Sequence, residues 1–274
     1  MSVLHDLAPR SRRSEPGRRR PVPAAATPAT TTPAGPGYAR RHAADYDRWF
    51  AESAATPATV ATLACLAGPG PVLELGVGTG RIALPLARTG LDVHGIEASE
   101  AMLRQLRAKP GGTELPVVLG DFADVPVAGR FTLVYAAGGS FCELPDRDAQ
   151  QRCLAGVAAR LTPGGLLALD AHVPEALAVA AASGVPEVVS ESDDHLVLCH
   201  RRIDHATQSC RSHYLVHEGG RTHHVRVRSR YASPGELDLM AEAAGLRLMA
   251  RHGSWDKAPF TGDSTSHVSV YTRR

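Results

Sequence analysis

The chain has 274 residues, a formal net charge of +2, and a composition in which 43% of the residues are hydrophobic and 21% are charged. This length and composition are typical of a globular protein with a large core, and they exclude fibrous and collagen-like classes. No apolar run approaches the roughly 20 residues that a membrane helix requires. We therefore expect a soluble protein that does not bind or span a membrane.

The first 37 residues are rich in Arg, Pro, Ala and Thr and contain few large apolar side chains. Such a segment cannot bury enough apolar surface to fold, so we expect a disordered tail at 1–37 and one domain at 38–274. Residues 1–20 hold six arginines and two acidic residues, which leaves the rest of the chain with a formal net charge of −2. A mildly acidic domain is a poor electrostatic match for nucleic acid, which we do not expect as a substrate.

Five cysteines are scattered along the chain without a C-x-x-C pair. An odd number without that pairing is unsuited to a disulfide framework and favours a reducing compartment, so we predict a cytoplasmic protein. Ten of the thirteen histidines lie from His172 onward, but neighbours such as His223 and His224 lack the spacing of a known zinc site. We therefore expect no metal.

The first specific motif joins an apolar strand that begins at Val72 to a helix through a glycine loop, with the sequence ELGVGTGR at 74–81. Glycines at alternate positions, Gly76, Gly78 and Gly80, remove the Cβ atoms from one side of the turn, so a ligand can approach the main chain closely. The dinucleotide fingerprint G-x-G-x-x-G needs its third glycine where this chain has Arg81. The loop therefore indicates a nucleotide site but disfavours NAD.

Two further strands end in residues that suit a nucleoside. The strand at 92–96 is followed by Glu97, roughly 20 residues after the loop, where a Rossmann-like unit places an acid for the ribose diol. Its two carboxylate oxygens can accept from both ribose hydroxyls. The strand that begins at Val117 ends in Asp121 and Phe122.

Together, the E-x-G-x-G-x-G loop, Glu97 and the pair of Asp121 and Phe122 resemble the motifs of class I methyltransferases that use S-adenosylmethionine. The resemblance covers roughly Tyr38 to the C-terminus and is strongest to the bacterial natural-product branch. It implies that S-adenosylmethionine is the cofactor, that the acceptor is a small molecule, and that the enzyme is a monomer or homodimer.

The resemblance also implies which residues hold the cofactor. Asp121 would accept from the adenine amino group beside Phe122, and the aromatic segment at 38–50 would fold over the cofactor. Tyr38 and Tyr46 would then face the methionine end or the sulfonium, because an aromatic ring or hydroxyl suits a cation. The full predicted set is Tyr38, Tyr46, Glu74, Gly76, Gly78, Gly80, Arg81, Glu97, Ala98, Met102, Asp121, Phe122, Ala136 and Phe141.

Helices alternate with short apolar strands through the first two thirds of the chain, which predicts a parallel sheet covered on both faces. A fourth strand is expected at 131–137, a helix at 147–161, and a fifth strand at 166–170 after the turn Thr162–Gly165. With the family resemblance, the prediction is an α/β fold: a Rossmann-like, doubly wound, seven-stranded sheet that ends in a reversed C-terminal hairpin.

The C-terminal third contains alternating stretches at 195–204, 210–217 and 223–230, which predict antiparallel strands. A helix follows, with Ser233 as its N-cap and Gly245 after its end. The hairpin strands are expected at 246–255 and 267–272. We therefore predict an inserted antiparallel sheet at 174–230 that binds the substrate and shapes the acceptor site.

His172 is the predicted general base, because it lies just past the fifth strand and imidazole titrates near neutral pH. Asp170, on the same strand face, would orient it or bind the substrate directly. A base is needed only if the acceptor must lose a proton, and the sequence leaves C-, N- and O-methylation open. Two alternatives also stay open: an NAD(P)-dependent oxidoreductase and a methyltransferase-like binding protein without catalysis.

Overall fold

The structure, a computed structural model, describes residues 35–50 and 57–273, so almost all of the predicted tail lies outside the described residues. The helices are α1 (Gly35–His42), α2 (Tyr46–Phe50), α3 (Pro57–Ala67), α4 (Ala83–Ala87), α5 (Glu100–Arg107), the 3-10 helix η2 (Ser140–Glu143), α6 (Arg147–Arg160), α7 (Pro174–Ala182) and α8 (Pro234–Ala243). The strands are β1 (Val72–Leu75), β2 (Val93–Glu97), β3 (Val117–Leu119), β4 (Phe131–Ala136), β5 (Leu161–His172), β6 (Glu187–Glu191), β7 (His195–Asp204), β8 (Ser209–Glu218), β9 (Arg221–Arg230), β10 (Leu246–His252) and β11 (Ser266–Arg273).

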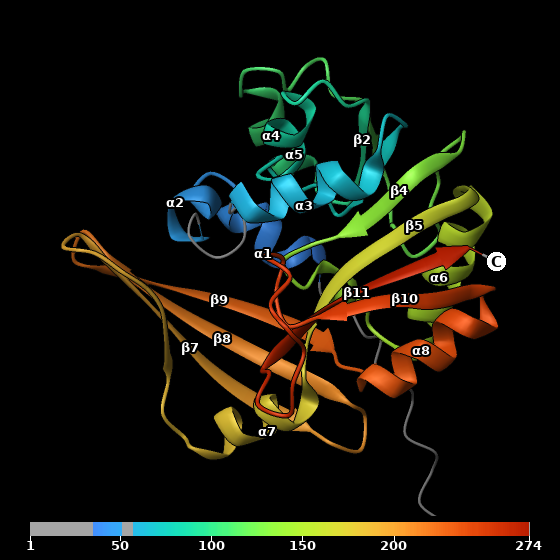
Figure 1. Cartoon of the computed structure of the whole chain (residues 1–274). Coiled ribbons are helices and arrows are strands. Elements are labelled where there is room, and N and C mark those ends of the chain that lie inside the picture. The colour runs from blue at the N-terminus through green and yellow to red at the C-terminus, as the bar shows by residue number, and fades with distance from the viewer. Residues whose placement is uncertain (1–34, 51–56, 274) are drawn as a thin grey trace, which may run out of the picture. The chain divides into compact units, whose positions relative to one another are not determined.

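Seven strands form the main sheet in the order β10-β11-β5-β4-β1-β2-β3, and β11 runs antiparallel to both of its neighbours (Figure 1). This confirms the predicted seven-stranded sheet with a reversed hairpin. All four residues of β1 are buried, because helices cover both faces of the sheet. Leu63 of α3, Leu84 of α4 and Leu106 of α5 belong to the core on one face. Leu154 of α6 and Leu237 of α8 belong to the core on the other face.

The fifth strand begins earlier than predicted. β5 starts directly at Leu161, and Thr162–Gly165, expected as a turn before the strand, lies within it. The parallel ladder between β4 and β5 is irregular here: Phe131 pairs with Leu161, and regular pairing resumes at Leu133 and Leu166. The extra residues of β5 thus form an irregular stretch rather than a separate turn.

The insertion contains a four-stranded antiparallel sheet in the order β6-β7-β8-β9. Figure 1 shows β7, β8 and β9 side by side. The start of the insertion differs from the prediction, which gave an antiparallel sheet over 174–230. The structure begins this range with helix α7, and strand β6 follows. Pro174 at the first turn and the alanines that follow it are ordinary helix signals. The alternating pattern appears only from β7 onward.

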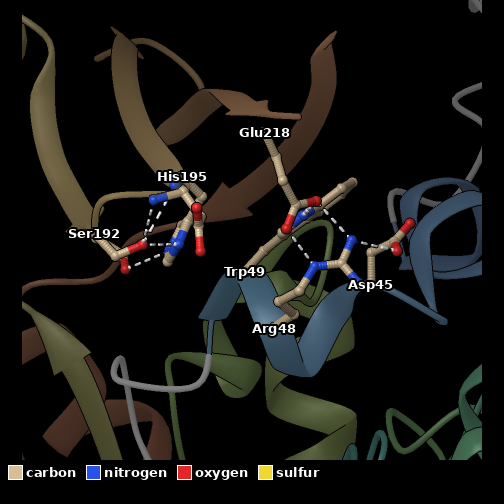
Figure 2. A network of polar contacts seen from close by, with 8 residues as sticks. Asp45, Arg48, Trp49, Ser192, His195 and Glu218 are labelled. Atoms are coloured by element: carbon tan, nitrogen blue, oxygen red, sulfur yellow. Dashed lines mark hydrogen bonds and ion pairs between the residues drawn. The ribbon is translucent and has the colours of Figure 1, made fainter. Parts of the chain in front are cut away.

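One face of the antiparallel sheet packs against α2. Trp49 and Phe50 of α2 form a buried cluster with Val197, Val216 and Val225, which come from β7, β8 and β9. Polar contacts close the same interface at its rim: Arg48 Nη2 donates to Glu218 Oε2 at 2.6 Å, and Trp49 Nε1 donates to the same oxygen at 3.1 Å (Figure 2). The short helix α2 is thereby fixed to the inserted sheet.

The opposite face of this sheet carries like charges in register. Arg202, Arg211 and Arg228 are exposed and lie directly opposite one another on the three neighbouring strands β7, β8 and β9. Like charges in directly opposed positions destabilise a sheet. The continuous ladders between β7, β8 and β9 and the apolar clusters on the other face offset this repulsion.

Candidate functional site

Two adjoining cavities lie at the carboxyl ends of the parallel strands. The first, here called the loop cavity, is formed by the glycine loop after β1, the end of β2 and residues of α1 and α2. The second, here called the sheet cavity, has a volume of about 460 Å³ and lies between the end of β5 and the antiparallel sheet. Both are lined by Tyr38, Tyr46, Arg81, Gly138 and Glu143, so these five residues form their common boundary.

The glycines of the loop have two different tasks. Gly76 and Gly78 line the loop cavity with φ of +75° and +56°, a backbone conformation that glycine adopts without strain. Gly80 also has a positive φ, +79°, but it is buried, and a Cβ there would lie 2.9 Å from Leu84 Cγ. Gly80 therefore allows α4 to pack closely and does not belong to the residues that line the cavity.

Glu97 fixes the loop from the end of β2. Its Oε2 accepts from the Gly78 amide at 2.7 Å, and its Oε1 accepts from the Ser99 amide at 2.8 Å. The side chain is buried and lines the loop cavity, and this burial raises its pKa. Each carboxylate oxygen has a further lone pair, so Glu97 can also accept from hydroxyls of a bound ligand.

Two more acids face the same cavity. Glu74 accepts from the Tyr135 hydroxyl at 2.8 Å, and burial raises its pKa to about 8. Glu143, on η2, accepts from the Tyr38 hydroxyl, and burial raises its pKa to about 7. Arg81 also lines the cavity and opposes the rise in the Glu74 pKa. One guanidinium does not balance three desolvated carboxyl groups, which are costly to ionise together without a further cation. The loop cavity is therefore suited to a positively charged nucleoside.

Most of the predicted cofactor residues line the loop cavity: Tyr38, Tyr46, Glu74, Gly76, Gly78, Arg81, Glu97, Ala98, Met102 and Phe122. Asp121 does not, because its side chain is exposed and its Oδ1 accepts from the Ala123 amide at 2.8 Å. Ala136 and Phe141 are buried in the core on the α6 face. Their neighbours Ala137 and Ser140 line the cavity instead.

Helix α2 is anchored to the glycine loop by residues that the sequence analysis missed. Asp47 forms an ion pair with Lys109 and accepts from the hydroxyl of Thr79. The Arg81 guanidinium lies 5.4 Å from the centre of the Tyr46 ring, a cation–π distance. These contacts join α2 to the loop, whereas Arg48 joins it to the inserted sheet. No local sequence pattern marked Asp47 and Lys109, which are 62 positions apart in the sequence.

The two residues predicted to be catalytic both line the sheet cavity. Asp170 accepts from the Gly138 amide at 3.0 Å, the Gly139 amide at 2.7 Å and Trp255 Nε1 at 2.8 Å. It therefore holds the turn after β4, and no hydrogen bond to His172 is found among the described residues. The pKa of His172 is lowered by desolvation in the cavity and by the nearby Arg201 guanidinium.

Arg201 extends from the inner face of β7 into the sheet cavity, which Tyr214 and Trp255 also line. The Arg201 side chain is only 11% exposed and forms an ion pair with Glu187. Guanidinium, imidazole and aromatic groups thus surround this cavity, a mixture that suits a polar organic molecule.

In residues 35–50 and 57–273, no group of three or more His, Cys, Asp or Glu side chains is arranged to hold a metal ion. None of the helices described is long and apolar enough to cross a bilayer.

A family model of the methyltransferase domain matches residues 72–165, which include the glycine loop and β1 to β4. The structure resembles the CcbJ methyltransferase from Streptomyces caelestis, with a TM-score of 0.78, 37% identity, and coverage of 87% of this chain and 99% of that chain. The cypemycin N-terminal methyltransferase from Streptomyces sp is 29% identical over 74% of this chain and 83% of its own length. The sugar N-methyltransferase KedS8 from Streptoalloteichus sp shares the fold, with a TM-score of 0.59, 21% identity, and coverage of 84% of this chain and 92% of its own.

The cavity that suits a cationic nucleoside, the seven-stranded sheet with its reversed hairpin, and the 37% identity across nearly the whole of a known methyltransferase agree with one another. The chain therefore belongs to the class I methyltransferases that use S-adenosylmethionine.

Proposed function

We propose that the protein transfers a methyl group to a nitrogen atom of a small natural-product acceptor bound in the sheet cavity. The observation that carries this proposal is the common boundary of the two cavities. A cofactor in the loop cavity and an acceptor in the sheet cavity would meet beside Tyr38, Tyr46, Arg81, Gly138 and Glu143. The size of the sheet cavity, about 460 Å³, lies within the roughly 300 to 1,000 Å³ typical of small-molecule sites.

On the cofactor side, we assign the ribose hydroxyls to Glu97 and the adenine ring to the apolar surface of Phe122 and Met102. Glu74 and Glu143 supply negative charge near the cationic end, and Tyr38 and Tyr46 cover it. The bound cofactor supplies an electrophilic methyl group whose bonding electron pair leaves with sulfur. We assign no cofactor contact to Asp121, which accepts from the Ala123 amide in the loop after β3.

The chain contributes mainly by positioning. Asp170 fixes Gly138 and Gly139, and these small residues leave open space where the acceptor must approach in line. Holding the two reactants about 3 to 3.5 Å apart in line can contribute roughly 7 to 11 kcal/mol of the barrier reduction. Helix α2, anchored on both sides, places Tyr46 at this boundary.

Nitrogen is favoured as the methylated atom for two reasons. An amine in its ammonium form can pair with the ionised carboxylate of Glu143, and a carboxyl group with a pKa of about 7 can accept the proton that must be removed. The cypemycin relative is named for methylation at an N-terminal amine. We further propose that the enzyme works in the cytoplasm, which agrees with five cysteines that are all free thiols. We also propose that it is a monomer or homodimer.

The test is a turnover assay of the purified full chain with S-adenosylmethionine and matched acceptor pairs. Each pair has an amine and its hydroxyl counterpart, for example an amino pentose against the pentose, and a peptide with a free N-terminus against its N-acetyl form. We expect release of the demethylated cofactor with amines only. Turnover with hydroxyl compounds alone, or with no member of any pair, contradicts the proposal.

A further inference from the structure

We infer that Glu143 is the catalytic base of this enzyme, and that its carboxylate binds the acceptor as an ammonium ion and takes its proton before methyl transfer. The inference rests on the proposed N-methylation and adds to it a residue and a protonation step. It moves the proton acceptor from the predicted His172, which lines only the sheet cavity, to the boundary between the two cavities.

The position of Glu143 follows from the turn after β4. Gly139 adopts φ of +76° and starts η2, whose last residue is Glu143. This short helix lies against the glycine loop, because a Cβ on Gly76 would be 3.5 Å from both Cβ and Oγ of Ser140. Glu143 lines both cavities, whereas His172 lines only the sheet cavity. Among the described residues, Glu143 is therefore the acid placed to touch an acceptor atom that faces the cofactor.

The groups around Glu143 bring the pKa of its carboxyl group close to neutral pH. Burial raises its pKa to about 7, the Tyr38 hydroxyl at 3.2 Å opposes that shift by donating to the carboxylate, and Glu97 adds to it. The other titratable groups that interact with its charge are Tyr46 from α2, Tyr214 from β8 and the neighbouring Cys142. Arg81 shares the cavity boundary with it. A base whose pKa lies near the working pH combines a usable ionised fraction with good proton affinity.

The acceptor enters as an ammonium ion, one N–H bond breaks, and an O–H bond forms on Glu143, which frees the nitrogen lone pair. That lone pair forms the new N–C bond as the S–C bond of the donor breaks, and the electron pair of that bond stays on sulfur. The product leaves as a protonated, methylated amine, and Glu143 returns its proton to water when the site opens.

The decisive variant is Glu143→Gln, which keeps the shape of the side chain but cannot accept a proton from an ammonium ion. With the best amine of the panel and saturating cofactor, we expect kcat to fall about a hundredfold or more, while cofactor affinity measured by calorimetry changes less than tenfold. For the wild type, kcat should rise with pH along an acid limb at about 7 or somewhat below, because the bound cation favours the carboxylate. Glu114→Gln, on an exposed loop, is the matched control and should behave as the wild type.

Two more variants distinguish Glu143 from His172 as the proton acceptor. Tyr38→Phe removes the donor that favours the carboxylate and should move the acid limb to higher pH, whereas His172→Ala should keep the limb in place. Independently of turnover, carboxyl spectra of ¹³C-glutamate-labelled protein should contain a resonance that titrates near 7 and is missing from Glu143→Gln.

These experiments test the assignment of Glu143 separately from the proposed N-methylation. If the wild type methylates amines but Glu143→Gln retains its kcat and its acid limb, the assignment of the base is overturned and the proposed function stands. If His172→Ala loses the limb instead, the base is His172. If no amine is methylated by the wild type, the proposed function itself fails.

Discussion

The Tyr38 hydroxyl lies 3.2 Å from Oε1 of Glu143, although the two residues are 105 positions apart in the sequence. This contact joins helix α1, which covers the loop cavity, to the short helix that follows β4. It places a phenol and a carboxyl group at the boundary where methyl transfer is proposed. The hydrogen bond therefore connects α1 to the acid at the boundary between the two cavities.

The ribose assignment predicts that Glu97→Ala lowers affinity for S-adenosylmethionine tenfold or more, which corresponds to about 1.4 kcal/mol. The variant removes a hydroxyl acceptor and also releases the Gly78 amide that Glu97 holds. Isothermal calorimetry measures the effect. Glu100→Ala, an exposed acid three positions later, is the control that should leave affinity unchanged. Equal affinities of the Glu97 variant and the wild type would rule out the assignment.

Cofactor binding should release protons at neutral pH. Burial raises the pKa of Glu74 to about 8 and that of Glu143 to about 7, so both carry protons part of the time in the free enzyme. A bound cation favours their ionised forms and lowers both pKa values. Calorimetric titrations at pH 7 in buffers of different ionisation enthalpy should therefore show net proton release. If cofactor binding releases no protons, or takes protons up, the bound cation does not lower the pKa values of Glu74 and Glu143.

The buried Glu74 should make the free enzyme less stable as pH rises. Its folded pKa of about 8 lies above the usual value of 4.5, so the folded chain binds more protons than the unfolded chain between these limits. Its contribution to stability is present in full below about 4.5 and falls by about 1.4 kcal/mol per pH unit inside that window. Urea unfolding of Glu74→Gln should show a flatter dependence on pH than the wild type. Parallel curves for the two proteins would show that Glu74 titrates normally.

Removal of the charge repulsion among the opposed arginines of the inserted sheet should stabilise the protein. Arg211 lies directly between Arg202 and Arg228, so Arg211→Thr removes two like-charge neighbours and introduces a residue that favours strands. We expect a gain of about 0.5 kcal/mol at low salt that disappears at high salt, because the exposed charges are then screened. Arg247→Thr, at an exposed position of β10 opposite Thr272, is the matched control without this gain. A gain in stability that persists at high salt would show that the strand propensity of Thr, and not the removal of charge, stabilises the variant.

The sequence predicted what depends on local pattern. The glycine loop, the strand that ends in Glu97 and the alternation of β7 to β9 are each contained in a short window, and the structure has them where they were expected. Helix α7 was missed because the whole insertion was read as strand, although Pro174 and its alanines favour a helix. Asp121 was assigned by motif position alone, and only the structure reveals that its carboxylate turns back to the Ala123 amide.

The parts of the site that could not be predicted depend on contacts between distant segments. Glu143 has no motif of its own, and its importance arises from burial beside Tyr38 and Glu97, which come from other elements. Asp47 matters because it meets Lys109 and Thr79 across the edge of the loop cavity. A single sequence contains no signal for such pairs, because the fold itself brings them together.

The most direct test of the central claim is to identify the atom that receives the methyl group. The full chain is incubated with S-adenosylmethionine labelled with ¹³C in its methyl group and with the amine that turns over best, and the product is examined by NMR. The account predicts a labelled methyl carbon with the chemical shift and proton couplings of an N-methyl group. A labelled O-methyl or C-methyl group, or label that stays entirely in the cofactor, would contradict it.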